Sequence, residues 1–254
     1  MSDAVLVEAR DNVLVITINR PEARNAVNGA VATGMAEALD RLDAEPGLFV
    51  GVLTGSGGTF SSGMDLKGFL KGESPVVEGR GLAGLTQAPP NKPLIAAVEG
   101  WALAGGFEMV LACDLVVAAR DAKFGLPEVK RSLVAGGGGL LRLPQRLPYH
   151  LAMELSLTGE PLSAERAHQH GLVSRLVDSG QALEGALELA ATIAANGPLA
   201  VAATKEIVRR SLDWTEDEGW KNQNDIMIPV FGSEDAREGA VAFAEKRPPV
   251  WQGK

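Results

Sequence analysis

One stretch, residues 94–119, constrains the fold of this chain more than any other: LIAAVEGWALAGGFEMVLACDLVVAA. Apolar runs on either side of a glycine turn predict a strand, the turn, a helix and a second strand. The helix would begin at Gly105 and Gly106, where backbone N–H groups have no partner inside the helix and favour negative charge. Glu108 is a carboxylate within this otherwise apolar helix. A carboxylate close to free N–H groups in a water-poor site indicates acid/base chemistry with stabilisation of an oxyanion.

The length and charge of the chain limit its class. With 254 residues it can form one large core domain with a small appendage. A net charge of −8 argues against binding to nucleic acid or to an anionic membrane through bulk charge. No window approaches the roughly 20 apolar residues that span a bilayer, and the N-terminal residues lack the pattern of a secretion signal. The sequence therefore predicts a soluble cytoplasmic protein.

The cysteine and histidine residues argue against a metal site. Cys113 is the single cysteine, which rules out an internal disulfide, and its apolar neighbours predict a buried, unreactive thiol. His150, His168 and His170 fall in late helices without a metal-ligand pattern. Asp114 is the acid that follows the apolar helix, and we expect it to accept backbone hydrogen bonds rather than to act in catalysis.

Periodicity along the rest of the chain predicts strands followed by helices. Strands are predicted at 4–8, 13–18, 49–54, 123–125 and 172–177. Helices are predicted from an Asn28 cap to about Ala44, and at 148–157, 163–170, 181–195, 199–212, 215–228 and 234–246, the last capped by Ser233. The apolar face predicted for 181–195 consists of Leu183, Leu187, Ala190, Ala191 and Ala194. This order predicts an α/β core in residues 1–196 and a helical region in residues 197–254.

Two segments are rich in glycine. Residues 55–69 predict a loop that leads into a short helix after Asp65. Residues 71–93 mix glycine and proline with charged and small residues. This composition fits a mobile loop or lid that is partly helical at 82–87, and it fits a disordered surface connection equally well.

Three motifs occur in a characteristic order: FSSGMDLK at 60–67, ALAGGFE at 102–108 and FGLPEVK at 124–130. Together they resemble the crotonase (enoyl-CoA hydratase/isomerase) superfamily. The segments at 20–27, 92–100, 157–173 and 243–251 are similar to that family too, so the resemblance covers nearly the whole chain. It implies an α/β fold of the ClpP/crotonase-like type, a spiral of ββα units followed by a helical C-terminal trimerisation region.

The resemblance also implies catalytic roles. The backbone N–H groups of Met64 and Gly105 would bind the thioester oxygen, and one such donor is worth roughly 3–4 kcal/mol in known cases. Glu108 and Glu128 would hold a water molecule between them. Glu128 would donate the proton to C2 of the substrate, and Glu108 would orient and activate the water.

Coenzyme A would enter as part of the substrate, and the resemblance implies no metal or redox cofactor. The first loop and basic residues would bind it, with contacts from Arg24, Ser62, Met64, Asp65, Leu66 and Lys67. Phe243 and Lys246 would lie near the nucleotide of a neighbouring subunit. The implied assembly is a homotrimer or a hexamer made of two trimers.

The chain departs from the family pattern after Glu128. Ser132 and Ala135 stand where the family often has Gly and Pro, and four glycines follow at 136–139. This run would either loosen the pocket wall or leave room for a bulky acyl group. For the large side chain of Trp101, packing in the core is a better explanation than narrowing of the acyl pocket.

The leading hypothesis is an enoyl-CoA hydratase that adds water to a trans-2-enoyl-CoA. The C-terminal segment 233–251 resembles carnitinyl-CoA dehydratase-like members, which is the first alternative. A double-bond isomerase and a non-catalytic acyl-CoA-binding homologue are the others.

Overall fold

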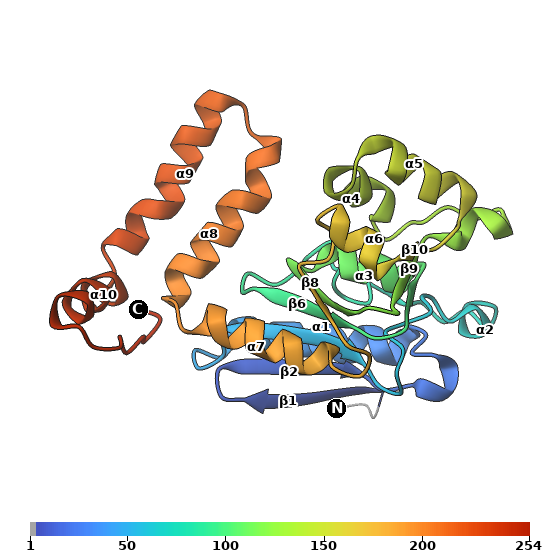
Figure 1. Ribbon diagram of the computed structural model, residues 1–254, viewed down its shortest axis with the longest axis horizontal. Helices are drawn as coiled ribbons and strands as arrows, with labels where there is room; N and C mark the ends of the chain where they lie inside the picture. Colours follow the sequence, from blue (N-terminus) through green and yellow to red (C-terminus); the bar gives the residue numbers. More distant parts are fainter. Residues whose placement is uncertain (1–3) are drawn as a thin grey trace.

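A six-stranded sheet forms the centre of the protein in a computed structural model that describes residues 4–254 (Figure 1). Its strand order is β1–β2–β3–β6–β8–β11, in which β1 and β2 are antiparallel and every later neighbour is parallel. The strands span Val5–Arg10 (β1), Val13–Ile18 (β2), Val50–Gly55 (β3), Leu94–Val98 (β6), Leu115–Ala119 (β8) and Arg175–Val177 (β11). The mixed α/β architecture predicted from the sequence is confirmed. The predicted core starts at residue 1, and residues 1–3 lie outside the described part.

Helices cover both faces of this sheet, and the alternation of apolar residues in the strands explains why. In β6, Leu94, Ala96 and Val98 pack in one buried cluster with α1 (Gly29–Ala44) and α3 (Gly105–Ala112). The intervening Ile95 and Ala97 belong to a second cluster, which α7 (Ala182–Ala194) covers. Because successive side chains of a strand point to opposite faces, a strand that is apolar throughout must be covered on both sides.

A smaller sheet positions the start of α3. It consists of β7 (Trp101–Leu103), β9 (Lys123–Gly125) and β10 (Leu162–Ser163), with β9 in the middle. Single bridges join Ser61 to Ala102 and Val27 to Met64. The first glycine-rich loop, residues 55–69, therefore lies beside β7. It is close to the glycine turn at Gly105 and Gly106 where α3 begins.

Shorter elements surround the two sheets. They are η1 (Pro21–Ala23), α2 (Leu66–Phe69), β4 (Val76–Val77), β5 (Gly81–Leu82), η2 (Pro127–Arg131), α4 (Gly139–Arg146), α5 (Tyr149–Thr158) and α6 (Ala164–Gln169). The predicted caps of two helices are confirmed: the Asn28 side chain accepts from the N–H of Val31, and the Ser233 side chain accepts from the N–H of Ala236.

Two predictions about secondary structure are wrong. Residues 82–87 are not helical, because Ala83 and Gly84 adopt left-handed conformations with φ of 55° and 63°. The disordered-connection alternative for 71–93 also fails, since β4 and β5 pair there and Leu85 is fully buried. The apolar face predicted for α7 is confirmed except at one position: Leu183, Leu187, Ala190 and Ala194 pack in or against the second cluster, whereas Ala191 is exposed.

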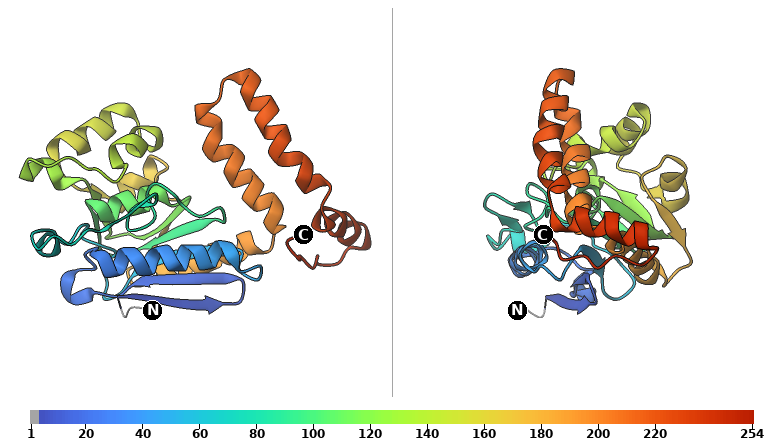
Figure 2. Two further views of the ribbon diagram at one scale, coloured as in Figure 1. Left: turned by 180° about the vertical axis from the view of Figure 1, so that it is seen from behind. Right: turned by 90° about the vertical axis from the view of Figure 1, so that its left-hand side faces the viewer.

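The C-terminal helices extend away from the sheets (Figures 1 and 2). They are α8 (Pro198–Arg210), η3 (Ser211–Asp213), α9 (Glu216–Phe231) and α10 (Glu234–Glu245). Within the described residues 4–254, α8 and α9 contain no buried residue. Large apolar side chains are exposed on α9 and α10, namely Trp220, Ile228, Phe231, Val241 and Phe243.

A partly buried ion pair connects α8 to the core. The Nζ of Lys205 in α8 lies 2.6 Å from Oδ2 of Asp114, and it also donates to the carbonyl oxygen of Lys92 at 2.9 Å. The same Asp114 oxygen accepts from the N–H of Leu94 at 2.8 Å. Asp114 therefore has the structural role predicted from the sequence.

No single helix in the described part of the chain is long and apolar enough to cross a membrane. The one pair of helices that passes the same test together, Ala182–Ala194 with Pro198–Asp213, is bent by 107°.

Candidate active site

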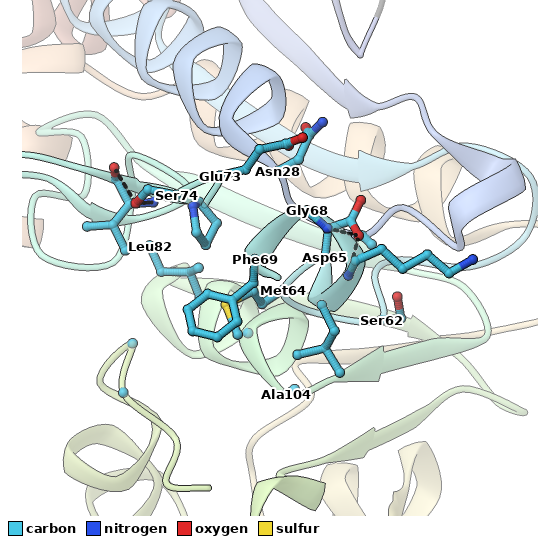
Figure 3. A pocket seen from close by; sticks show the side chains of 18 of the residues that line it. Asn28, Ser62, Met64, Asp65, Gly68, Phe69, Glu73, Ser74, Leu82 and Ala104 are labelled. Carbon is cyan, nitrogen blue, oxygen red and sulfur yellow. Dashed lines mark hydrogen bonds between the residues drawn. The ribbon is translucent and has the colours of Figure 1, made fainter. Parts of the chain in front are cut away.

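A cavity of about 1210 Å³ is lined by the first glycine-rich loop, by the turn that begins α3 and by the segment after β9. Its lining includes the four residues predicted to be catalytic, Met64, Gly105, Glu108 and Glu128. The residues predicted to bind coenzyme A also line it, namely Arg24, Ser62, Asp65, Leu66 and Lys67. Figure 3 shows the contribution of the α2 segment, with Met64, Asp65 and Phe69 around the cavity. The structure thus brings together nearly all of the residues that the sequence singled out.

Phe243 and Lys246 are the exceptions. Phe243 lies in α10 with 87% of its surface exposed, Lys246 is the residue that follows that helix, and neither lines the cavity of its own chain. Their predicted contact with the nucleotide of a neighbouring subunit stays a prediction.

Two residues that line this cavity have backbone N–H groups without an acceptor in the described part of the chain. Within residues 4–254, neither the amide of Met64 nor that of Gly105 donates a hydrogen bond to the protein. They lie close together, because a Cβ placed on Gly105 would be 3.6 Å from the nitrogen of Met64. Ala104, just before α3, has a φ of 51°, a strained value for a residue with a side chain. The strain is consistent with a backbone bent to present these amides.

Close packing explains the glycine in the first loop. Gly63 has a φ of 90°, and a Cβ there would lie 2.8 Å from the nitrogen of Gly105. Any side chain at this position would push the first loop away from the start of α3 and so separate the amides of Met64 and Gly105.

Glu108 is almost completely buried, with 3% of its surface exposed. Its Oε1 accepts two backbone hydrogen bonds, from the N–H of Gly137 at 2.7 Å and from that of Gly139 at 2.9 Å. A Cβ on Gly137 would lie only 2.6 Å from Oε2 of Glu108, and one on Gly139 would lie 3.0 Å from its Cγ. Two of the four glycines at 136–139 therefore form an amide cradle for this carboxylate, a role that the sequence analysis missed.

Glu128 is in a different environment. It follows Pro127 in η2, and its Oε2 is buried without a hydrogen-bond partner in the described part of the chain. Burial raises the pKa of Glu128, its own backbone N–H opposes this, and the charge of Glu108 adds to the increase.

Burial also raises the pKa of Glu108, but the amides of Gly139 and Gly137 and the charge of Arg142 oppose that increase. The cradle stabilises the ionised form of Glu108, whereas the buried Oε2 of Glu128 has no such donor. Burial thus raises the pKa of both carboxyl groups, and the amide cradle distinguishes the environment of Glu108 from that of Glu128.

The environment of Glu128 predicts that Glu128→Gln stabilises the fold at alkaline pH. Because the folded-state pKa is raised above its unfolded value, ionisation of this group favours unfolding. The penalty is absent well below the unfolded pKa and complete once the pH exceeds the folded pKa. We expect the variant to melt at a higher temperature than the parent at pH 8, with a difference that shrinks on acidification, measured by calorimetry from pH 4 to 8.

Glu45→Gln is the control for this measurement. An exposed hydrogen bond from Arg41 lowers the pKa of Glu45, so its removal has the opposite sign. A Glu128→Gln protein that melts below the parent at pH 8 would contradict the assigned environment.

A salt bridge supports the first loop. Arg20 donates to Oδ2 of Asp65 at 3.0 Å and to the carbonyl oxygen of Ala26 at 2.6 Å. Asp65 in turn accepts from the N–H groups of Lys67 and Gly68, which fixes the start of α2 directly after Met64 (Figure 3). The amide of Gly68, aided by Arg20, lowers the pKa of Asp65 against the effect of burial. Arg20 belongs to the segment 20–27, in which the sequence analysis selected only Arg24.

The predictions for two other residues had different outcomes. Cys113 is fully buried, so the predicted burial is confirmed, and burial raises the pKa of its thiol. Trp101 does not pack in the core: 42% of its surface is exposed, it does not line the cavity, and Lys123 Nζ lies 5.2 Å from its ring centre.

Within residues 4–254, no group of three or more His, Cys, Asp or Glu side chains could hold a metal ion.

Comparison with known proteins places this fold and cavity in a family. Residues 8–254 match the family model described as enoyl-CoA hydratase/isomerase. The chain is 44% identical to an enoyl-CoA hydratase of Mycobacterium tuberculosis, EchA19, over 98% of this chain and 96% of that protein. It is 42% identical to a carnitinyl-CoA dehydratase of Salmonella typhi over the full length of both. A crystal structure of the enoyl-CoA hydratase EchA1 from Mycobacterium marinum superposes with a TM-score of 0.98 at 63% identity, covering both chains completely.

The chain belongs to the enoyl-CoA hydratase/isomerase family. The superfamily and the crotonase-like fold that the sequence motifs implied are confirmed.

Proposed function

We propose that this protein is an enoyl-CoA hydratase, which adds water reversibly and with syn geometry to a trans-2-enoyl-CoA and forms a 3-hydroxyacyl-CoA. One observation carries the proposal: Glu108 and Glu128 line the same cavity as the unpaired amides of Met64 and Gly105. These residues supply two acid/base groups and two oxyanion donors, which are the catalytic groups that the hydration reaction requires.

The two amides would bind the thioester oxygen and stabilise the negative charge that develops on it during addition. The ionised carboxylate of Glu108, held by its amide cradle, would activate the water by taking one of its protons while the water oxygen bonds to C3. Glu128 would carry the proton that bonds to C2, because its buried Oε2 has no donor that favours the anion. The oxygen and the proton then arrive from the side of the substrate where both carboxyl groups lie.

Coenzyme A would lie along the first loop. Arg24, Ser62, Asp65, Leu66 and Lys67 all line the corresponding part of the cavity. The two cations suit its phosphates, and the backbone after Met64 suits its uncharged portion.

The exposed apolar residues of α9 and α10 support assembly into a homotrimer or a dimer of trimers. In such an assembly, Phe243 and Lys246 would approach the nucleotide of a neighbouring subunit. We expect light scattering at micromolar concentration to give three or six times the chain mass of 26.6 kDa. A mass equal to that of one chain would contradict the proposal.

Carnitinyl-CoA dehydratase is the second candidate, since relatives with that name align over the whole chain. A carnitinyl group carries a quaternary ammonium, which proteins commonly bind with several aromatic side chains. Among the described residues, Phe69 is the single aromatic one that lines the cavity, and the cation Arg131 lines it too. These features favour an uncharged acyl group.

A panel of trans-2-enoyl-CoA thioesters of graded size, with crotonyl-CoA as the smallest and crotonobetainyl-CoA as the cationic member, tests the proposal. We expect 3-hydroxyacyl products and faster turnover of the uncharged thioesters. A 3-enoyl product would indicate an isomerase, preference for crotonobetainyl-CoA would indicate the dehydratase, and binding without turnover would indicate a non-catalytic homologue.

A further inference from the structure

Arg142 lies behind the carboxylate of Glu108. It is a half-buried residue of α4 that does not line the cavity, and it forms no ion pair within residues 4–254. Its Nη2 donates to the carbonyl oxygen of Thr86 at 2.5 Å, and its backbone N–H donates to the carbonyl oxygen of Gly138 at 3.0 Å. The side chain therefore spans from α4 to the segment after β5.

The guanidinium also occupies the space above Gly138. This glycine has a φ of 92°, and a Cβ there would overlap Nη1 of Arg142. Gly138 lies between the two residues whose amides hold Oε1 of Glu108. Arg142 thus supports the amide cradle twice, through a main-chain hydrogen bond and through packing of its side chain.

The contact with Thr86 connects this support to another segment of the cavity lining. The hydroxyl of Thr86 accepts from the N–H of Leu82, and both Leu82 and Gln87 line the cavity. The strand and turn that form this segment are therefore tied through Arg142 to the residues that hold Glu108.

We propose that Arg142 is a positioning residue that fixes the amide cradle at 137–139 and so keeps Glu108 ionised and aimed at the substrate water. The inference rests on the proposed hydratase function. It assigns to Arg142 an action through Glu108 rather than contact with the substrate.

The charges around this site agree with that role. Glu108 faces Glu128 from η2 and Arg142 from α4, and the charge of Arg142 opposes the increase in the pKa of Glu108 that burial causes. Arg142 itself faces Arg146 of the same helix, Arg209 of α8 and Cys113 after α3. Burial and the neighbouring Arg146 lower the pKa of Arg142, yet a guanidinium stays charged at any pH at which the protein is folded.

Substitution of Arg142 tests the proposal by its effect on the pH profile. In Arg142→Gln we expect kcat to fall by about 10- to 100-fold with KM within about threefold, because only the water-activating group is displaced. The acidic limb of kcat against pH should move to higher pH. Arg142→Lys should restore the acidic limb, because it keeps the charge, but not the full kcat, because it cannot bridge to Thr86 in the same way. Arg142→Met, which fills the space without charge, replaces Arg142→Gln if that variant does not fold.

Arg146→Gln is the matched control. Arg146 lies one turn further along α4 and is exposed, and its side chain donates a long hydrogen bond of 3.4 Å to the carbonyl oxygen of Leu111. We expect its pH profile to equal that of the parent. An acidic limb that stays in place in Arg142→Gln and Arg142→Met, or that moves equally in Arg146→Gln, would overturn the proposal.

A readout without turnover separates this inference from the proposed function. Carboxyl ¹³C NMR of labelled glutamate, assigned with Glu108→Gln, reports the pKa of Glu108 whether or not the protein hydrates anything. A higher pKa in Arg142→Gln supports the positioning role, and an unchanged pKa refutes it. A parent enzyme that hydrates no thioester refutes the function instead.

Discussion

Glu128→Gln is expected to lower kcat for hydration of crotonyl-CoA by about 10²–10⁴-fold, the range typical of losing a positioned general acid. The amide cannot deliver a proton to C2, although it fills the same space beside Pro127. The thioester is bound by the amides of Met64 and Gly105 and by the first loop, none of which the substitution changes. Affinity for a saturated thioester such as butyryl-CoA, measured by calorimetry, should therefore remain within about threefold of the parent.

Glu160→Gln is the control for this substitution. Glu160 is an exposed carboxylate that pairs with Lys130 and does not line the cavity. Its loss should leave kcat unchanged. Full turnover by Glu128→Gln would show that another group donates the proton, and the assignment of the two glutamates would be wrong.

Gly137→Ala is expected to reduce kcat by about 100-fold, because displacement of a catalytic group by about 1 Å has an effect of that size. The added methyl group would lie 2.6 Å from Oε2 of Glu108, so either the carboxylate or the amide that holds it must move. The measurement is kcat and KM for crotonyl-CoA, together with the melting temperature to confirm that the variant is folded.

Gly136→Ala provides a control with the same chemical change one residue earlier. Gly136 also lines the cavity, but a Cβ there would meet nothing closer than the carbonyl oxygen of Val134 at 4.0 Å. Its kcat should stay near the parental value. Equal losses in the two variants would mean that the glycine run serves flexibility and not the placement of Glu108.

Local signals in the sequence predicted much of the fold. Asn28 and Ser233 each indicate where a helix begins, because a cap depends only on residues two or three positions away. The same is true of Asp65, whose side chain accepts from the amides that follow it. The strand–turn–helix order of 94–119 was predictable for the same reason, except that β7 forms a separate strand before α3.

Features that depend on distant contacts could not be predicted in this way. The cradle for Glu108 joins residues about 30 positions apart, and nothing near Gly137 or Gly139 indicates which carboxylate their amides hold. Trp101 appeared suited to the core, but the small sheet leaves its ring beside Lys123 at the surface. The left-handed turn at Ala83 likewise follows from its tertiary surroundings, in which that residue is fully buried.

The candidate site was predictable where motifs carried the family resemblance. These motifs selected Glu108, Glu128, Met64 and Gly105, and the structure places all four around one cavity. They did not select the supporting residues Arg20 and Arg142, because each acts on another protein group through tertiary contacts.

The most direct test of the central claim is a crystal structure of the protein with a bound 3-hydroxyacyl-CoA. We predict that the thioester oxygen lies about 2.7–3.1 Å from both the Met64 and the Gly105 nitrogen, the distance of an oxyanion donor. The 3-hydroxyl group should contact the carboxyl groups of both Glu108 and Glu128. A thioester oxygen bound elsewhere, or a hydroxyl group that touches neither glutamate, would contradict the account.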